Sequence, residues 1–503
     1  MRNKLFIAVA GALVCAAVAT PGAAMASRVG MKTNLSTVAR IPDRGTFVSY
    51  GATQPVQRGA STWHAVQLSE AHALAAIAKG GMVIAAPDGH PVQLHFVRSI
   101  RHADGNWSWI GRPDGARPGT EALLTFGPKA VFGTIPNGKG LPLELTTVGG
   151  RTYVVETDAR KLSASAVAAS GNDMVGAPVL PSSSLASATA AQSASATATS
   201  DPALNTKVNA RVDLILGYTT GFATRLGGQS QAATRLHFMV DIANQAYANS
   251  GVKGQLVLLG TVQVNYPDDT QNRATLYALS GVNCTATAAA GQHYLPDVGV
   301  NCTAVAPPAA LQPLLNARQQ YGADLVALVR NYTVPQNQTC GVAWLLGGGQ
   351  NAFTAGDVNF GLSVVSDSSG SLYPSNGNTC RNETLAHELG HNMGLAHDRA
   401  TAAGTDDSNN DSNLLDPEEY GRYADSFGYT TGAGAGNFYT IMAVPALGQV
   451  SYRVFSNPQI TACGGFACGV AQVADNARTL NLTMAMVQDF RAPPAAPAPI
   501  TQK

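Results

Sequence analysis

The chain has 503 residues, of which 45% are hydrophobic and 13% are charged, and its formal net charge is +1. This length and composition allow two or three domains with sizeable hydrophobic cores. The near-zero charge argues against a nucleic-acid-binding protein, which needs a clustered basic surface.

The N-terminal segment 1–26 has the pattern of a secretory signal peptide. Basic residues at positions 2 and 4 precede an apolar run, and Ala-Met-Ala at 24–26 matches a cleavage site. A membrane anchor is the alternative, but the apolar run is shorter than the roughly 20 residues of a membrane-spanning helix. We therefore expect a protein secreted to the periplasm or the extracellular space, without a stable membrane anchor.

Residues 27–161 are predicted to form a mostly β prodomain. Short runs rich in β-branched and aromatic residues alternate with Gly, Pro and Asp, as in "NWSWIG" and "RTYVVETD". An independent binding module is the alternative interpretation. Residues 162–204 consist mainly of Ala, Ser and Thr without a helical or strand period, so we expect a flexible linker that contains the processing region.

Residues 205–491 are predicted to form an α/β (α+β) domain. Apolar runs typical of buried strands alternate with stretches of helical period, an order that gives a mixed sheet covered by helices. Residues 341–349 are a candidate edge strand of this sheet. The Pro/Ala-rich tail, residues 492–503, is expected to be disordered. The remaining strands are expected at 211–220, 254–266, 323–333 and 360–367, and the helices at 229–251 and 310–322.

Removal of the signal peptide would leave six cysteines, an even number that indicates three disulfides in an exported chain. We expect them to pair in sequential order, because Cys463 and Cys468 enclose a short loop with two glycines. Buried free thiols are the alternative for some of them. The six cysteines are Cys284, Cys302, Cys340, Cys380, Cys463 and Cys468.

The stretch "HELGHNMGLAHD" has the spacing of a catalytic zinc site. On a helix, His387 and His391 lie one turn apart on the same face, so both imidazoles can bind a single ion. Glu388 lies beside them, where a general base can reach water at the metal. Gly394 can end the helix and turn the chain, which brings in His397 as the third ligand and leaves a fourth position for water.

The full pattern H-E-x-x-H-x-x-G-x-x-H resembles the zinc signature of the metzincin peptidases. The resemblance covers residues 208–491 and implies one catalytic zinc ion, an active-site helix and a mixed, mostly parallel twisted sheet. It also implies a methionine turn beneath the metal, which "FYTIMAVP" supplies with Met442. Asp398 directly after His397 resembles the reprolysin-like branch, where this acid supports the fold behind the zinc site. The absence of a tyrosine two residues after Met442 argues against the astacin branch.

Among the metzincins, the chain is most similar to secreted bacterial peptidyl-Asp metalloendopeptidases, which cut before aspartate. The resemblance implies a zinc endopeptidase made as a zymogen, which hydrolyses internal bonds of protein or peptide substrates with Glu388 as general base. We expect a monomer. Two alternatives stay open, namely a broad-specificity metzincin with a hydrophobic preference and a secreted binding protein with a vestigial zinc site.

Substrate contacts are expected at two places. An extended peptide could add as a strand beside the predicted edge strand, between Trp344 and Gly348, through main-chain hydrogen bonds. A preference for aspartate would need a cation in the pocket beyond the zinc, for which Arg453 is the candidate and Arg422 the alternate. A solvated surface position for Arg453 is the alternative interpretation.

The predicted prodomain is the expected inhibitor of the zymogen, yet it contains no cysteine that could bind the metal as a thiolate. Inhibition must therefore be steric, or must use another donor. If the enzyme cuts before aspartate, Asp173 or Asp201 would mark a self-processing site in the linker. The histidines that could act as the donor are His64, His72, His90, His95 and His102.

A weaker pattern in "DSNNDSNLLDPE" predicts a calcium site. Its acidic and amide side chains have the spacing of the ligands in a calcium-binding loop. A serine replaces the usual central glycine and no clear helix precedes the run, so a solvated acidic loop is the alternative. The candidate Ca²⁺ ligands are Asp407, Asn409, Asp411, Asn413 and Glu418.

Overall fold

The computed structural model describes residues 35–138, 140–161, 173–178, 180, 209–285, 301–333, 339–369, 380–405, 414–446 and 448–492. The predicted signal peptide, most of the predicted linker and the Pro/Ala-rich tail after residue 492 lie outside the described residues. So do four of the five candidate calcium ligands and the side chain of the fifth, Glu418, and the calcium site stays a prediction. Within the described ranges, no helix is long and apolar enough to cross a membrane.

The N-terminal part forms an antiparallel sheet of ten strands, in line with its short β-prone runs. Its elements are β1 (Val48–Tyr50), β2 (Val56–Arg58), β3 (Ser61–Leu68), α1 (Glu70–Lys79), β4 (Gly81–Ala85), β5 (Pro91–Arg101), β6 (Trp107–Pro113), β7 (Ala122–Phe126), β8 (Val131–Ile135), β9 (Leu143–Val148) and β10 (Arg151–Thr157). The strand order is β1-β3-β10-β9-β8-β7-β6-β5-β4, with β2 paired to β3. Trp107, Trp109 and Phe126 are buried in its apolar core, which α1 covers beside β4 and β5.

The second sheet has six strands, in the order β11-β17-β18-β16-β12-β13. These strands are β11 (Met174–Gly176), β12 (Ala210–Thr219), β13 (Gly254–Val264), β16 (Leu325–Asn331), β17 (Gly341–Leu345) and β18 (Leu362–Asp367). Strands β12, β13, β16 and β18 run parallel to one another. Strand β17 runs antiparallel to β18, and β11 runs parallel to β17. The sheet is therefore mixed and mostly parallel.

The helices and smaller elements cover this sheet and build the site. The α-helices are α4 (Thr220–Leu226), α5 (Gln229–Asn249), α6 (Asn272–Ser280), α7 (Gln312–Tyr321), α8 (Thr384–Asn392), α9 (Arg399–Thr405) and α10 (Asn476–Val487). The short strands are β14 (Val282–Thr285), β15 (Asn301–Ala304), β19 (Ala396–Asp398), β20 (Phe427–Gly428), β21 (Phe438–Tyr439) and β22 (Val450–Ser451). The 3₁₀ turns are η1 (Ala159–Lys161), η2 (Ala309–Leu311), η3 (Asp357–Phe360), η4 (Pro417–Glu419) and η5 (Ala433–Ala435).

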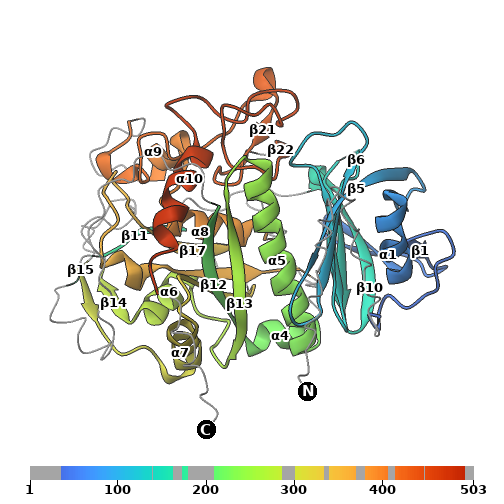
Figure 1. The fold of residues 1–503 in the computed structure, drawn as a ribbon, viewed down its shortest axis with the longest axis horizontal. Helices are drawn as coiled ribbons and strands as arrows, with labels where there is room; N and C mark the ends of the chain where they lie inside the picture. Colours follow the sequence, from blue (N-terminus) through green and yellow to red (C-terminus); the bar gives the residue numbers. More distant parts are fainter. Residues whose placement is uncertain are drawn as a thin grey trace, which may run out of the picture. The chain divides into compact units, whose positions relative to one another are not determined.

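Helix α5 joins the two sheets. It lies between them (Figure 1) and packs against β13 on one side and against β7 and β8 on the other. Apolar side chains of both parts share one core, in which Phe132 of the N-terminal sheet and Phe238 of α5 are fully buried. Polar contacts also connect α5 to the N-terminal part. The carboxylate of Asp241 on α5 accepts a hydrogen bond from Ser108 and lies 3.0 Å from His102 Nε2. The N-terminal part is thus packed directly onto the helix that also contacts α8.

The segment expected to be a linker contains a strand, which corrects the expectation that residues 162–204 carry no strand pattern. Residues Met174–Gly176 form β11, in which Val175 stands opposite Trp344 of β17. Met174 and Val175 are buried. So short an apolar run can form a strand here because the open edge of β17 supplies hydrogen-bond partners, a long-range effect that no local pattern reveals.

The predicted sequential disulfide pairing is confirmed. Each bridge joins cysteines that are neighbours in the sequence, so each closes a local loop. One connects β14 to β15, and another connects the start of β17 to the segment before α8. The bridges are Cys284–Cys302, Cys340–Cys380 and Cys463–Cys468.

Candidate metal centre

Helix α8 presents the first two predicted ligands on one face. The Nε2 atoms of His387 and His391 lie 3.1 Å apart, and both side chains are buried. The helix ends at Asn392 with Met393 as its C-cap, and Gly394 adopts a φ of 85°, in the left-handed region that favours glycine. The chain then turns into β19, which carries His397. The three imidazoles therefore converge as the motif predicts, with their ring centroids 4.8 to 5.3 Å apart.

The turn at Gly394 leaves no room for a side chain. A Cβ at this position would lie 2.6 Å from the Cβ of Arg422, and the φ of 85° would strain any other residue. We expect Gly394→Ala to shift β19 and to weaken zinc binding about 10-fold or more, the scale of disturbed ligand support. Competition against a fluorescent zinc chelator measures this change. Gly432→Ala is the matched control, because a Cβ at Gly432 would meet nothing within 4 Å; equal affinities for both variants would refute the expectation.

Backbone carbonyls fix the orientation of two ligands. The Nδ1 atom of His387 lies 2.9 Å from the carbonyl oxygen of Ile441, and that of His391 lies 2.7 Å from the carbonyl oxygen of Leu395. Because a carbonyl can only accept, each Nδ1 must carry the hydrogen, which leaves the lone pair of each Nε2 facing the centre of the site.

Met442 lies against the active-site helix, as the resemblance implies. It is fully buried, and a Cβ at Gly390 of α8 would lie 2.7 Å from its sulfur atom. The preceding carbonyl, that of Ile441, is the one that orients His387. The methionine turn thus supports the helix and one ligand together.

Asp398 supports the fold behind the site through hydrogen bonds. Its carboxylate accepts from the backbone N–H and the hydroxyl of Thr401, at 3.1 and 2.7 Å, and from the backbone N–H of Val444 at 3.0 Å. It therefore ties the start of α9 to the chain just after Met442.

The fourth group at the site is a carboxylate from the N-terminal side of the chain. One oxygen of Asp173, Oδ1, lies 2.7 Å from His397 Nε2 and 4.0 Å from His391 Nε2, and the other lies 3.6 Å from His387 Nε2. The backbone carbonyl of Asp173 accepts a hydrogen bond from Ala343 of β17 at 2.9 Å. These four side chains are all buried.

Glu388 extends from α8 toward β17. A Cβ at Gly341 would lie 2.1 Å from its Oε1, so the glycine makes room for this carboxylate. Its Oε2 is buried and has no hydrogen-bond partner within the described residues. The side chain therefore has one oxygen free to take part in chemistry beside the histidines.

The electrostatics favour neutral imidazoles at two ligands. Burial lowers the pKa of His387 to about 4 and lowers the pKa of His391 well below its usual range. Burial also opposes protonation of His397, but the carboxylate of Asp173 overrides it and raises the pKa of this ring. Burial and the charge of Asp173 raise the pKa of Glu388 well above its ordinary value. Neutral imidazole is the form that binds metals.

The group fits a zinc ion. Buried His397 Nε2, Asp173 Oδ1 and Glu388 Oε2 make no hydrogen bond within the described residues, although the first two lie in ion-pair contact. A cation would satisfy these convergent lone pairs together and compensate their loss of solvation. Two nitrogen ligands on a tetrahedral zinc ion lie about 3.3 Å apart, close to the spacing of His387 and His391.

The residues predicted to contact substrate differ in how accessible they are. Trp344 lies on β17, and its ring is buried against Tyr277 and Phe360. The prediction that this strand is the sheet edge is wrong for the full chain, because β11 pairs with β17 opposite Trp344 and is itself the edge strand. Gly348 lies in the turn just after this strand. Arg422 is buried beneath the turn at Gly394 and donates to the carbonyl oxygen of Gln350 at 3.3 Å.

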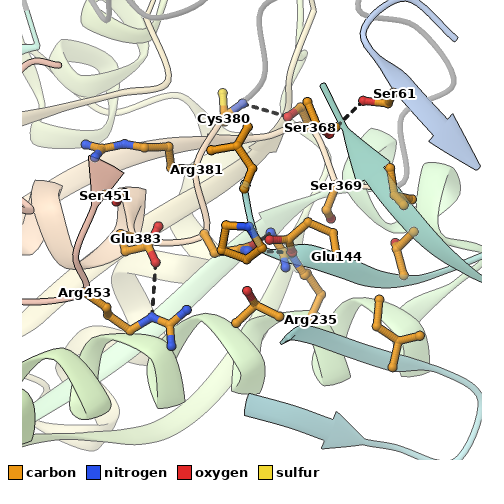
Figure 2. A pocket seen from close by; sticks show the side chains of 18 of the residues that line it. Ser61, Glu144, Arg235, Ser368, Ser369, Cys380, Arg381, Glu383, Ser451 and Arg453 are labelled. Carbon is orange, nitrogen blue, oxygen red and sulfur yellow. Dashed lines mark hydrogen bonds and ion pairs between the residues drawn. The ribbon is translucent and has the colours of Figure 1, made fainter. Parts of the chain in front are cut away.

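Arg453 is buried and paired, so the interpretation as a solvated surface arginine is wrong. Its Nε donates to Glu383 at 3.1 Å and its Nη1 to the carbonyl oxygen of Glu121 at 3.1 Å. It lines a cavity of about 250 Å³ between the N-terminal sheet and the start of α8. Figure 2 shows Glu383 and Arg453 meeting in this cavity, and Glu144 of β9 close to Arg235.

The same cavity contains Arg381, which the sequence motifs did not single out. Its guanidinium donates to the carbonyl oxygen of Ile441 at 3.3 Å, the same oxygen that orients His387. It also lies 5.1 Å from the ring centroid of Tyr439. Within the described residues, no acidic side chain forms an ion pair with it. Its position just before the active-site helix was the only signal in the sequence.

The five histidines considered as inhibitory donors lie away from the metal centre. His72 contacts Asp43, and His90 contacts Asp88. His64 lies near Glu156, His95 near Asp114 and His102 near Asp241. The residue that reaches the centre is Asp173. The sequence does carry a signal for it, because Asp173 is the sole charged residue between Lys161 and Asp201.

Comparisons with known proteins agree with the geometry. A family model described as "Metallo-peptidase family M12B Reprolysin-like" matches residues 208–291 and 295–474. A peptidyl-Asp metalloendopeptidase of Pseudomonas aeruginosa is 28% identical over 293 residues, which are 56% of this chain and 40% of that protein. The match thus spans less than half of the relative's length. A solved structure titled "Structure of a chaperone-substrate complex" matches with a TM-score of 0.36 and 18% identity, over 56% of this chain and 35% of that chain, too low a score to carry an argument.

Proposed function

The chain belongs to the reprolysin-like metallopeptidases of family M12B, and we propose that it is a secreted zinc endopeptidase made as a zymogen. The observation that carries the proposal is the convergence of His387, His391 and His397 beside the unpartnered oxygen of Glu388. Three histidine ligands with a nearby carboxylate are typical of a catalytic site, whereas structural zinc sites use a closed set of four protein ligands.

The residues of the site would have distinct roles in peptide hydrolysis. The histidines would hold a zinc ion, which, when bound, polarises the scissile carbonyl and activates water for attack. Glu388 accepts the proton of the attacking water at Oε2 and then delivers it to the nitrogen of the leaving amine. The hydrogen bonds from Nδ1 of His387 and His391 to backbone carbonyls keep both rings in place throughout.

Strand β17 would bind the substrate in the mature protein, once β11 no longer pairs with it. Its backbone can pair with an extended peptide, as it already does with β11. Such pairing suits unfolded segments and loops, which favours cleavage of internal bonds. The buried ring of Trp344 anchors the strand in the core, where its Nε1 donates to Ser280 at 2.7 Å.

We assign the preference for aspartate, which the relative's name suggests, to Arg381. Arg453 was the first candidate, but Glu383 already neutralises its charge. Arg381 lacks an acidic partner within the described part of the chain and shares the Ile441 carbonyl with His387, which sets it close to the metal centre. An acidic side chain just after the cleaved bond could reach it.

Arg381→Gln is expected to lower the preference for aspartate over leucine peptides by about 10–100-fold, because a charged hydrogen bond contributes about 1.5–3 kcal/mol. The ratio of kcat/KM values for matched peptides measures the change. Arg399→Gln is the control. Arg399 also stacks on an aromatic ring, that of Phe427, but it lies on α9 and does not line the cavity that contains Arg381. Undiminished discrimination in Arg381→Gln would refute the assignment and favour a broad, hydrophobic specificity.

Mapping of cleavage products tests the proposed activity. Mature secreted protein is incubated with a denatured protein, and the new termini are identified by mass spectrometry. We expect internal cuts, with aspartate enriched directly after the cut. The alternative of a binding protein with a vestigial zinc site predicts no new termini at all.

A further inference from the structure

We propose that Asp173 is the inhibitory ligand of the zymogen, its carboxylate occupying the fourth metal position until the N-terminal part is removed. The inference rests on the proposed function, since it assumes that the three histidines hold zinc. It replaces the expected histidine donor with a carboxylate from the segment between the two sheets.

The carboxylate has the contacts of a ligand. Its oxygens lie 2.7 Å from His397 Nε2 and 3.6 Å from His387 Nε2, and its side chain is buried. Asp173 Oδ1 makes no hydrogen bond within the described residues. In the absence of a metal this carboxylate can pair only with His397, whereas a cation bound among the three imidazole nitrogens would compensate its charge from all of them. Carboxylate oxygens are ordinary zinc ligands.

The chain after Asp173 holds this carboxylate in position. Its backbone carbonyl accepts from Ala343, and the next three residues pair with β17 as β11. Met174 and Val175 are buried, Val175 fully. β11 therefore uses the same edge that a substrate strand needs, so the segment blocks the backbone of the peptide as well as the fourth metal position.

A second contact between the N-terminal part and the active-site region supports latency. Glu144 of β9 accepts a hydrogen bond at 2.7 Å from Asn382, two residues before α8. This carboxylate lines the cavity that also contains Arg381. The segment between the two sheets thus presents Asp173 to the metal centre, and the N-terminal sheet presents Glu144 to the cavity that contains Arg381.

Binding of an active-site probe tests the inference without any turnover. The full chain is prepared with Glu388→Gln, which keeps it uncleaved, and is loaded with zinc. A fluorescent peptide hydroxamate, which binds zinc at the position of the attacking water, is titrated by fluorescence anisotropy. Asp173→Ala is expected to tighten probe binding by about 10-fold or more, because the competent state is no longer a minor fraction.

The controls separate the outcomes. Asp158→Ala removes an acid that pairs with Arg160 on the N-terminal part, and it should leave probe affinity unchanged. Asp173→Asn keeps the shape of the side chain and should also bind the probe more tightly, which covers a failure of Asp173→Ala to fold. The visible spectrum of the cobalt-substituted chain should change in the Asp173 variants and remain unchanged in Asp158→Ala.

Two results would overturn the inference. Equal probe affinity and equal cobalt spectra for the parent chain and Asp173→Asn would show that the carboxylate is no ligand, while zinc binding would leave the proposed function intact. If neither the parent chain nor Asp173→Asn binds zinc, the proposed function is overturned, and this inference with it.

Discussion

Glu388→Gln is expected to lower kcat/KM of the mature protein by about 10²–10⁴-fold, the contribution of a positioned general base. The amide keeps the size of the side chain above Gly341 but cannot accept a proton. The histidines remain in place, so zinc content should be unchanged. Initial rates of cleavage of a quenched fluorescent peptide, with zinc measured in the same samples, give the comparison.

Asp489→Asn is the matched control for this variant. Asp489 is exposed just after α10, in the part of the chain that the mature protein keeps. The control should retain the activity of the parent protein. Equal activity of Glu388→Gln and the parent would rule out Glu388 as the base and leave the vestigial zinc site as the better interpretation.

Asp367→Ala is expected to destabilise the folded chain by about 3–5 kcal/mol, the scale for removing one partner of a buried ion pair. Asp367 lies at the end of β18, where it pairs with Arg235 at 2.6 Å and with Arg225 at 2.7 Å. The variant would leave two guanidinium groups buried without their carboxylate. Urea denaturation of the full chain measures the loss, and Asp158→Ala should show none. A loss no larger than that of the control would contradict a structural role for the pair.

The same residue predicts a pH dependence of stability. Burial opposes ionisation of Asp367, but Arg235 and Arg225 override it and hold its pKa below the ordinary value. The folded pKa lies below the unfolded one of about 3.9, so the stabilisation is complete above that pH and is lost as the pH falls toward the folded pKa. The difference in unfolding free energy between the parent and Asp367→Ala should therefore shrink in acid. A difference that stayed constant from neutral pH to pH about 3 would contradict this linkage.

The local parts of the site could be predicted from the sequence. His387, His391 and Glu388 follow from helical spacing alone, and Gly394 marks the turn to His397. The sequential disulfides could be predicted for the same reason, because each closes a loop between neighbouring cysteines. These features depend on contacts that are short in sequence.

The parts of the site that depend on long-range contacts could not be predicted from the sequence. Asp173 reaches the metal centre only because β11 pairs with β17, a strand formed far along the chain. The sequence also could not show that Glu383 pairs with Arg453 in the folded chain and neutralises the charge that a preference for aspartate would need. Such pairings depend on tertiary packing, which overrides the low strand propensity of an Ala/Ser/Thr-rich segment.

The proposal that this chain is a zinc endopeptidase is tested most directly by one measurement on the mature protein. The initial rate of cleavage of an unfolded protein is recorded before chelation, after metal removal and after zinc is added back. We predict that the rate falls to background on metal removal and recovers with zinc. An unchanged rate in protein that elemental analysis shows to be free of zinc would contradict the proposal.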